Sequence, residues 1–369
     1  MTSRFGLRYR GHGFDNDGDC VCHSRRGFLA GVGAVGAAAA LAPAAAKAEA
    51  ADAAPRTVDV HHHIYPPRYL SDNGEMIAKT NGAFAARIKD WSTRSAVDRM
   101  DQAGVATAMN SMTSPGVWFE DGDAARARAR LCNEFGAQMI RDFPGRFGMF
   151  AAIPLPDTEG SLKEIEYALD VLKLDGIGLM TSYAGKLLGD PAFAPVFEQI
   201  NHRKAVVFVH PTMSCCDNPI PGVSPPTIEF PMDSTRTITS LLFSGGFTRY
   251  SDIKFIFCHG GGMLLPIVQR FHGPAAQMKP EERAIKMPKG PEYELTRQHY
   301  DLASIGFNPA AIAGLRRLIP SSQLLYGSDE PYQSTLQMSS ALQKLDFPTD
   351  ELAAVQRGNA VRLFTRLQT

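Results

Sequence analysis

The chain has 369 residues, of which 44% are hydrophobic and 21% are charged, and its 38 basic residues balance its 38 acidic residues. This balance is typical of a soluble globular protein with a sizeable core, and it argues against nucleic acid as a partner. Once an N-terminal segment of about 50 residues is set aside, roughly 315 residues remain, which is enough for one large α/β barrel or two smaller domains.

The N-terminal segment has the order of an export signal. Arg25 and Arg26 are followed by Gly-Phe-Leu, by an Ala/Gly/Val run over 30–42 and by small residues over 44–50. This order predicts a twin-arginine signal peptide over residues 1–50, export to the periplasm and a mature domain over 55–369. The apolar run is too short and too rich in alanine and glycine for a stable membrane anchor. A cytoplasmic protein is the alternative.

Beyond this segment, short apolar or β-branched runs recur at regular intervals, bounded by turn residues. Amphipathic stretches with helical spacing separate them, such as Ala124–Phe143 and Ser161–Leu172. An eightfold repeat of strand and helix predicts a (β/α)8 TIM barrel. The eight expected strands are Thr57–Ile64, Thr107–Met112, Phe147–Leu155, Gly176–Met180, Ala205–Pro211, Lys254–Gly260, Gln298–Ser304 and Gln323–Asp329.

Two connections are longer than a simple crossover. They are Ile64–Ser95 after the first expected strand and Thr212–Thr235 after the fifth. Long excursions after barrel strands lie at the C-terminal face of a barrel, where active sites form. We therefore expect both connections to contribute to a substrate pocket.

Residues that bind metals or carry protons end several of the expected strands. His61 and His63 are two positions apart, so they point to the same side of the first strand, while His62 points away. His210 ends the fifth strand, and His259 and Asp329 end the sixth and eighth. A single histidine after an apolar run is usually structural, but this convergence at one barrel mouth predicts a metal centre.

These residues resemble the pattern of the amidohydrolase superfamily. The wider sequence is similar to its decarboxylating branch, near aminocarboxymuconate-semialdehyde decarboxylase and the 6-methylsalicylate decarboxylases. The stretches that carry the resemblance are Asp59–Pro67, Arg99–Val105, Phe208–Pro211, Phe257–Gly262 and Gly327–Tyr332.

The resemblance implies a metal ion, zinc or in some relatives manganese, bound by His61, His63, His210 and Asp329. It also implies that His259 handles protons beside the metal. The expected fourth strand, Gly176–Met180, lacks the lysine that bridges two ions elsewhere in the superfamily. We therefore expect one ion per chain.

If the substrate is a carboxylic acid, we expect an arginine in its binding site, because a guanidinium group pairs with a carboxylate through two parallel hydrogen bonds. The resemblance suggests Arg87 as a substrate-binding residue and Arg270 as one that reaches the pocket of a neighbouring subunit, which implies a homodimer. The alternative is that each is an ordinary surface arginine. Trp91 and Trp118 are candidates for the pocket wall, and equally for core packing.

The resulting hypothesis is non-oxidative decarboxylation of an aromatic or related unsaturated carboxylic acid, such as a hydroxybenzoate similar to 6-methylsalicylate, with His259 and Asp329 as catalytic residues. Two alternatives stay open. The same ligands could activate water to hydrolyse a lactone or amide, or the barrel could be a binding protein without activity.

Overall fold

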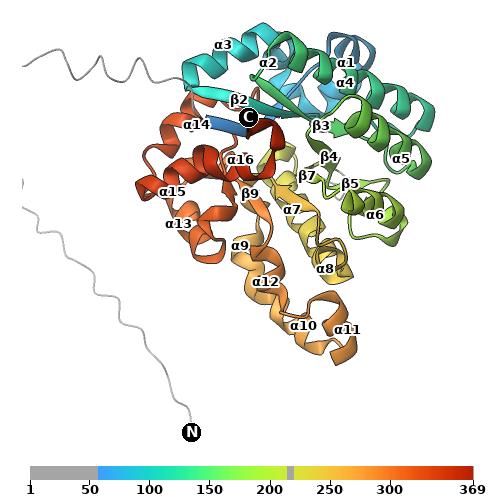
Figure 1. The fold of residues 1–369 in the computed structure, drawn as a ribbon, viewed down its shortest axis with the longest axis vertical. Coiled ribbons are helices and arrows are strands. Elements are labelled where there is room, and N and C mark those ends of the chain that lie inside the picture. Colours follow the sequence, from blue (N-terminus) through green and yellow to red (C-terminus); the bar gives the residue numbers. More distant parts are fainter. Residues whose placement is uncertain (1–56, 214–219, 369) are drawn as a thin grey trace, which may run out of the picture. The chain divides into compact units, whose positions relative to one another are not determined.

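The computed structural model describes residues 57–213 and 220–368. In this part of the chain, eight parallel strands form one sheet whose neighbours follow the order of the sequence, as in a (β/α)8 barrel (Figure 1). The predicted fold is therefore confirmed. The export signal expected at residues 1–50 lies outside the described residues. None of the described helices is long and apolar enough to cross a membrane.

Each predicted strand overlaps one strand of the barrel, although six of the eight are shorter than expected and the last two are shortened most. The barrel strands are β1 (Thr57–His63), β2 (Val105–Ser111), β3 (Phe147–Ala152), β4 (Gly176–Met180), β7 (Val206–His210), β8 (Lys254–Phe257), β9 (His299–Asp301) and β10 (Leu324–Leu325). The prediction missed a small antiparallel hairpin formed by β5 (Ser182–Tyr183) and β6 (Lys186–Leu187). Its two central residues, Ala184 and Gly185, both have positive φ angles, which suits a tight hairpin turn.

The barrel closes between its first and last strands. Val60 N donates to Tyr326 O over 3.0 Å, Asp329 N to His61 O over 2.8 Å, and His63 N to Glu330 O over 2.9 Å. This seam brings the two ends of the barrel sequence together, so that residues at the end of β1 lie beside those that follow β10.

A β-bulge in β1 decides which of its side chains face the barrel interior. Pairing with β2 shifts register between Asp59 and His62. Val58 belongs to the cluster of apolar side chains inside the barrel, and His61 contacts the ring of Phe208 in the same cluster. Val58 and His61 are three positions apart and would lie on opposite faces of a regular strand, so the bulge is what places both inside.

Helices surround the strands, as Figure 1 shows. Some of them begin at side-chain caps: Ser92 and Ser95 form a reciprocal capping box before α3, and Asp121 caps α4. The α-helices are α1 (Pro67–Asn81), α2 (Ala85–Lys89), α3 (Thr93–Ala103), α4 (Gly122–Asp142), α5 (Thr158–Glu166), α6 (Ala194–His202), α7 (Pro225–Ser244), α8 (Gly246–Arg249), α9 (Leu264–Ile267), α10 (His272–Gln277), α11 (Pro280–Lys286), α12 (Pro291–Thr296), α13 (Pro309–Leu318), α14 (Thr335–Leu342), α15 (Thr349–Ala353) and α16 (Asn359–Leu363).

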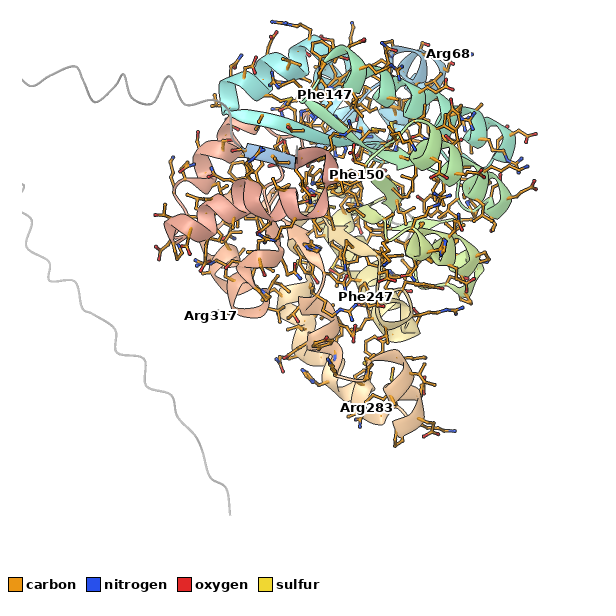
Figure 2. All side chains as sticks on the ribbon, in the orientation of Figure 1. Arg68, Phe147, Phe150, Phe247, Arg283 and Arg317 are labelled. Carbon is orange, nitrogen blue, oxygen red and sulfur yellow. The ribbon has the colours of Figure 1, made fainter. Side chains whose placement is uncertain are left out.

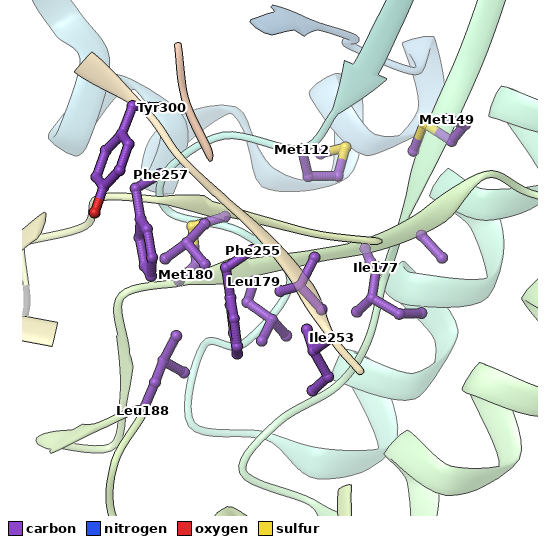
Figure 3. Packing of buried hydrophobic residues seen from close by; sticks show 14 of the residues in the cluster. Met112, Met149, Ile177, Leu179, Met180, Leu188, Ile253, Phe255, Phe257 and Tyr300 are labelled. Carbon is purple, nitrogen blue, oxygen red and sulfur yellow. The ribbon is translucent and has the colours of Figure 1, made fainter. Parts of the chain in front are cut away.

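The core has two apolar clusters. The larger fills the space between strands and helices, and Figure 3 shows part of it, where Phe255 and Phe257 of β8 stack with ring centroids 5.7 Å apart. The smaller lies inside the barrel, where Phe150 stacks on Phe208 at 5.2 Å. Charged side chains such as Arg283 lie at the periphery (Figure 2). The filled interior leaves the mouth of the barrel as the place for chemistry.

Candidate metal centre and active site

Four buried side chains meet at the C-terminal ends of three barrel strands. His61 and His63 end β1, His210 ends β7, and Asp329 follows β10. One potential ligand atom from each lies within 4.8 Å of the others. His61 Nε2 and His63 Nε2 are 3.1 Å apart, and Asp329 Oδ1 lies 3.2 Å and 3.1 Å from them. The structure therefore brings together the four residues predicted as metal ligands.

A second contact fixes the orientation of each histidine ring. His61 Nδ1 lies 2.9 Å from Asp301 Oδ2, His63 Nδ1 lies 3.3 Å from the Ser111 carbonyl oxygen, and His210 Nδ1 lies 2.8 Å from the Pro211 carbonyl oxygen. Carbonyl and carboxylate oxygens only accept hydrogen bonds, so each Nδ1 carries the proton and donates. When the Nε2 atoms carry no proton, they consequently present lone pairs to the centre.

This donor set fits a divalent cation. Three imidazole lone pairs and a carboxylate oxygen converge in a buried space, where they would repel one another without a positive charge between them. Zinc is bound by imidazole nitrogens and carboxylate oxygens in sets of this size, and oxygen ligands also suit manganese. Outer contacts of the kind that Asp301 makes to His61 are usual for metal-binding histidines.

The electrostatics of the centre reflect its burial. Burial alone would lower the pKa of His61, but the carboxylates of Asp301 and Asp329 raise it to about 10. Burial alone would raise the pKa of Asp329, but His61 and a hydrogen bond from His259 hold it well below its ordinary value. Since a histidine nitrogen cannot hold a proton and a metal at once, an ion that binds here displaces a proton from His61.

The two residues predicted as catalytic lie at the edge of this cluster. His259 Nε2 is 3.4 Å from Asp329 Oδ2, the carboxylate oxygen that faces away from His61 and His63. Both backbones are left-handed, with φ of 55° at His259 and 66° at Asp329. Such conformations cost about 1–3 kcal/mol at non-glycine residues and gather at functional sites, where the surrounding structure enforces them.

Asp301 is a functional residue that the sequence analysis missed. It ends β9, is fully buried and holds His61 through Oδ2, while its Oδ1 accepts from the backbone nitrogens of His259 and Ala303, both over 3.0 Å. The only sign in the sequence is that it is the one acidic residue in an otherwise uncharged strand run, Gln298–Ser304. Its partner His61 is 240 positions away.

Replacing Asp301 by asparagine should weaken metal binding about 10- to 100-fold, which is the usual cost of losing an outer-shell partner. The neutral amide oxygen is a weaker acceptor for the His61 Nδ1 proton than a carboxylate, and it does not balance the charge of His61. Competition with a chelator measures the effect, and Asp252→Asn, at an exposed aspartate, is the matched control. Unchanged metal affinity would show that Asp301 does not orient His61.

A cavity of about 460 Å³ opens onto the cluster. Apolar and neutral polar side chains form most of its wall, and the described residues that line it include no lysine or arginine. The lining residues are Asn81, Ala83, Phe84, Thr113, His210, Ser224, Pro226, Thr227, Phe230, Pro231, His259, Gly262, Met263, Ser304, Ile305, Asp329, Tyr332 and Gln333. They come mainly from the two long connections predicted to form the pocket and from the loops after β8, β9 and β10.

The two arginines predicted to bind substrate do not line this cavity. Arg87 donates to the backbone carbonyl oxygens of Tyr332 at 2.6 Å and Pro331 at 3.4 Å, beside a separate cavity of about 250 Å³. Arg270 is exposed in a 3₁₀ turn, Val268–Phe271, that continues α9. Substrate binding by either arginine therefore stays a prediction. Within this chain, Arg87 holds the segment that follows Asp329.

The two tryptophans take packing positions. Trp91 is buried, and its ring meets those of Tyr65 and Phe135 at 6.4 Å and 6.2 Å. Trp118 is half-buried and packs against the same core. Neither lines the cavity. Its aromatic walls are instead Phe84, Phe230 and Tyr332, which the sequence analysis did not single out.

Several known decarboxylases are similar to this chain in sequence or in fold. Decarboxylase yanB of Aspergillus niger is 34% identical over 331 residues, covering 84% of this chain and 88% of the relative. The 6-methylsalicylic acid decarboxylase of Penicillium expansum is 33% identical over 320 residues, covering 84% and 97%. A crystal structure of 5-carboxyvanillate decarboxylase from Novosphingobium aromaticivorans, with bound manganese, shares the fold with a TM-score of 0.75 at 20% identity, covering 84% and 97%.

A protein-family model described as amidohydrolase matches residues 58–366, which span all eight barrel strands except the first residue of β1. The match includes every residue of the buried cluster and of the cavity wall. The resemblance stated from the sequence is thereby confirmed, and the chain belongs to the amidohydrolase family.

Proposed function

We propose that this chain is a metal-dependent, non-oxidative decarboxylase of an aromatic carboxylic acid, with hydroxybenzoates similar to 6-methylsalicylate as the substrate class. The observation that carries the proposal is the buried group His61, His63, His210 and Asp329 at the base of an apolar-walled cavity. Relatives named as decarboxylases, at 33–34% identity over most of the chain, support it.

The chemistry explains why such a site is needed. Loss of CO2 directly from an aromatic ring would leave an electron pair in the ring plane, where it cannot delocalise. The ring carbon that bears the carboxylate must therefore gain a proton first. The bond from this carbon to the carboxylate then breaks, its electron pair restores the aromatic ring, and CO2 leaves.

We assign the supply of that proton to His259 and Asp329. The imidazole and the outer carboxylate oxygen form a pair across 3.4 Å, and both residues line the cavity. A proton held by this pair can reach the ring carbon of a substrate beside it. Asp301 fixes the backbone of His259, and the seam hydrogen bond to His61 O fixes that of Asp329.

The proposed cofactor is one zinc ion per chain, with manganese as the alternative because a structural neighbour was solved with it. Bound by His61, His63, His210 and Asp329, the ion would supply Lewis acidity toward the carboxylate and phenolic oxygens of the substrate. The walls formed by Phe84, Phe230, Ile305 and Tyr332 exclude water from the ring.

A panel of hydroxybenzoates tests the proposal directly. Metal-loaded protein should release CO2 and the corresponding phenol in equal amounts from at least one ortho-hydroxybenzoate. Treatment with a chelator should abolish this activity, and added zinc or manganese should restore it. Hydrolysis of lactones or amides without CO2 release from any acid would favour the hydrolase alternative, which uses the same ligands.

We further propose that the enzyme works as a homodimer in which Arg270 of one subunit serves the cavity of the other. The exposed position of Arg270 and the lack of a cationic side chain in the described cavity wall support this. A two-fold interface would place the same patch on both subunits.

Mixing two inactive variants, His259→Ala and Arg270→Ala, should then restore part of the activity. Each hybrid dimer contains one cavity in which both groups are intact, so up to about a quarter of wild-type activity is expected after random exchange of subunits. Light scattering and a mass-tagged subunit establish the exchange. A fully active monomer, or no rescue after proven exchange, would contradict the proposal.

Export through the twin-arginine route is also proposed, on the pattern at Arg25 and Arg26. Replacing both by lysine should leave the precursor in the cytoplasm, because the receptor reads the guanidinium pair. Cell fractionation with an antibody to the mature domain measures this. An unchanged amount of periplasmic product would indicate a different export route.

A further inference from the structure

A serine and a glutamine in the cavity wall have no part in the reaction described so far. Ser304 lies three residues after the end of β9, and Gln333 lies in the segment after β10. Both line the cavity that contains His259 and Asp329. Gln333 Nε2 donates a hydrogen bond to Ser304 Oγ, so the pair links the loops of the last two barrel strands.

The backbone of Ser304 is strained. Its φ and ψ angles are 61° and −52°, and Ile305 N donates to Ala303 O over 2.6 Å. These values describe a γ-turn of the rare, positive-φ form. Glycine would adopt this turn at lower cost, yet a residue with a hydroxyl group stands here. Strain of this kind persists where surrounding contacts enforce it, and it gathers at ligand-binding sites.

The contacts that hold Ser304 in this turn also position the loop that carries His259. Asp301 Oδ1 accepts from both Ala303 N and His259 N, which ties the start of the turn to the catalytic histidine. Ile305 packs so closely on Gly260 that a Cβ atom at Gly260 would clash with it. Ser304 is therefore held against the loop that carries His259.

Gln333 is tied to the other catalytic residue. Its backbone nitrogen donates to the carbonyl oxygen of Asp329 over 3.0 Å. Because the Gln333 amide donates to Ser304 Oγ, the hydroxyl proton of Ser304 stays free to donate to another acceptor. The described wall of the cavity holds no lysine or arginine, so beside His259 and the proposed ion its donors to an anionic group are neutral ones such as Ser304.

We propose that Ser304 donates a hydrogen bond to the carboxylate of the bound substrate and that Gln333 is a positioning residue that keeps this hydroxyl directed into the cavity. The proposal rests on the proposed function, since it requires an aromatic acid in this cavity. Beyond that function, it makes Ser304 a residue that determines specificity for a substrate with a carboxylate.

Binding measurements separate this role from turnover. Benzoate carries the carboxylate but lacks the ortho-hydroxyl group, and 3-methylphenol is the phenol that 6-methylsalicylate would give. With metal-loaded Ser304→Ala, the Kd of benzoate should rise about tenfold or more, since a hydrogen bond to a charged acceptor is lost. The Kd of 3-methylphenol should change less than about twofold, because the phenol has no carboxylate to lose a contact.

A second variant guards against a purely structural effect. Ser304→Gly removes the hydroxyl but suits the positive φ angle, so it should be at least as stable as Ser304→Ala while losing the same affinity for benzoate. Gln333→Glu should weaken benzoate binding at least as much, because a carboxylate can only accept and would turn the serine proton away from the cavity. Ser340→Ala, at an exposed serine of α14, is the control and should bind benzoate like wild type.

Wild-type affinity of Ser304→Ala for benzoate would overturn the proposal. Equal losses for benzoate and 3-methylphenol would also overturn it, since the hydroxyl would then meet an oxygen other than the carboxylate. If the wild type released no CO2 from any hydroxybenzoate while Ser304→Ala still lost benzoate affinity, the proposed reaction would fail and the carboxylate contact would be supported.

Discussion

The His63→Ala variant is expected to lose its metal and its decarboxylase activity together. His63 supplies one of three imidazole donors, its Nε2 lies 3.1 Å from both His61 Nε2 and Asp329 Oδ1, and its side chain is completely buried. Without it, the group His61, His210 and Asp329 retains only two imidazoles and one carboxylate. The loss of metal affinity should therefore exceed the roughly 10- to 100-fold cost of changing an outer-shell partner.

Elemental analysis of the purified protein measures the metal content, and CO2 release measures the activity. The neighbouring His62→Ala is the matched control, since His62 contacts Asn110 on the outer side of β1 and is not one of the four grouped ligands. Burial lowers the pKa of His62 to about 3, so the control removes a neutral ring. Retention of metal by His63→Ala would disprove the assignment of this cluster as the metal centre.

The His259→Asn variant is expected to keep its metal and lose about 10²- to 10⁴-fold in kcat, which is the usual contribution of a general acid or base. Asparagine retains a polar side chain and tolerates the left-handed backbone that His259 adopts, at a φ of 55°. The contact between the His259 imidazole and Asp329 is lost, whereas the four proposed ligand residues are unchanged.

Parallel measurement of kcat, KM and metal content distinguishes this result from damage to the site. His272→Asn is the control, because His272 is half-exposed and pairs with Glu292 at the surface. A variant that lost metal along with activity would make His259 a fifth ligand. A variant with normal kcat would remove His259 from proton transfer and leave that role to Asp329 alone.

The sequence was sufficient to predict the barrel and the grouping of the four proposed metal ligands, because both depend on short-range patterns. Successive side chains of a strand point to opposite faces, so His61 and His63 lie on the same face. Parallel barrel strands all end at one face of the barrel, regardless of the length of the connections between them. The positions of His210 and Asp329 follow from that geometry. The register shift between Asp59 and His62 includes His61, yet His61 and His63 still lie together in the buried group, as predicted.

What the sequence did not reveal depends on contacts between distant residues. Asp301 is identified by its partner His61, and a single aspartate in a strand carries no sign of that pairing. Arg87 contacts main-chain carbonyl oxygens after Asp329, a type of acceptor that every residue supplies. The left-handed backbones of His259, Ser304 and Asp329 likewise have no signature, since none of the three is glycine.

A bound metal ion would also have a mechanical role at the seam between β1 and β10. The last strand pairs over only two residues, Leu324 and Leu325, and a few main-chain hydrogen bonds join its continuation to β1. His61 and His63 stand on one side of this seam and Asp329 on the other. An ion bound to all three would join the two sides of the seam, where His63 and Asp329 are 266 positions apart in the sequence. The same ion that polarises a substrate would thus also keep the two ends of the barrel from separating.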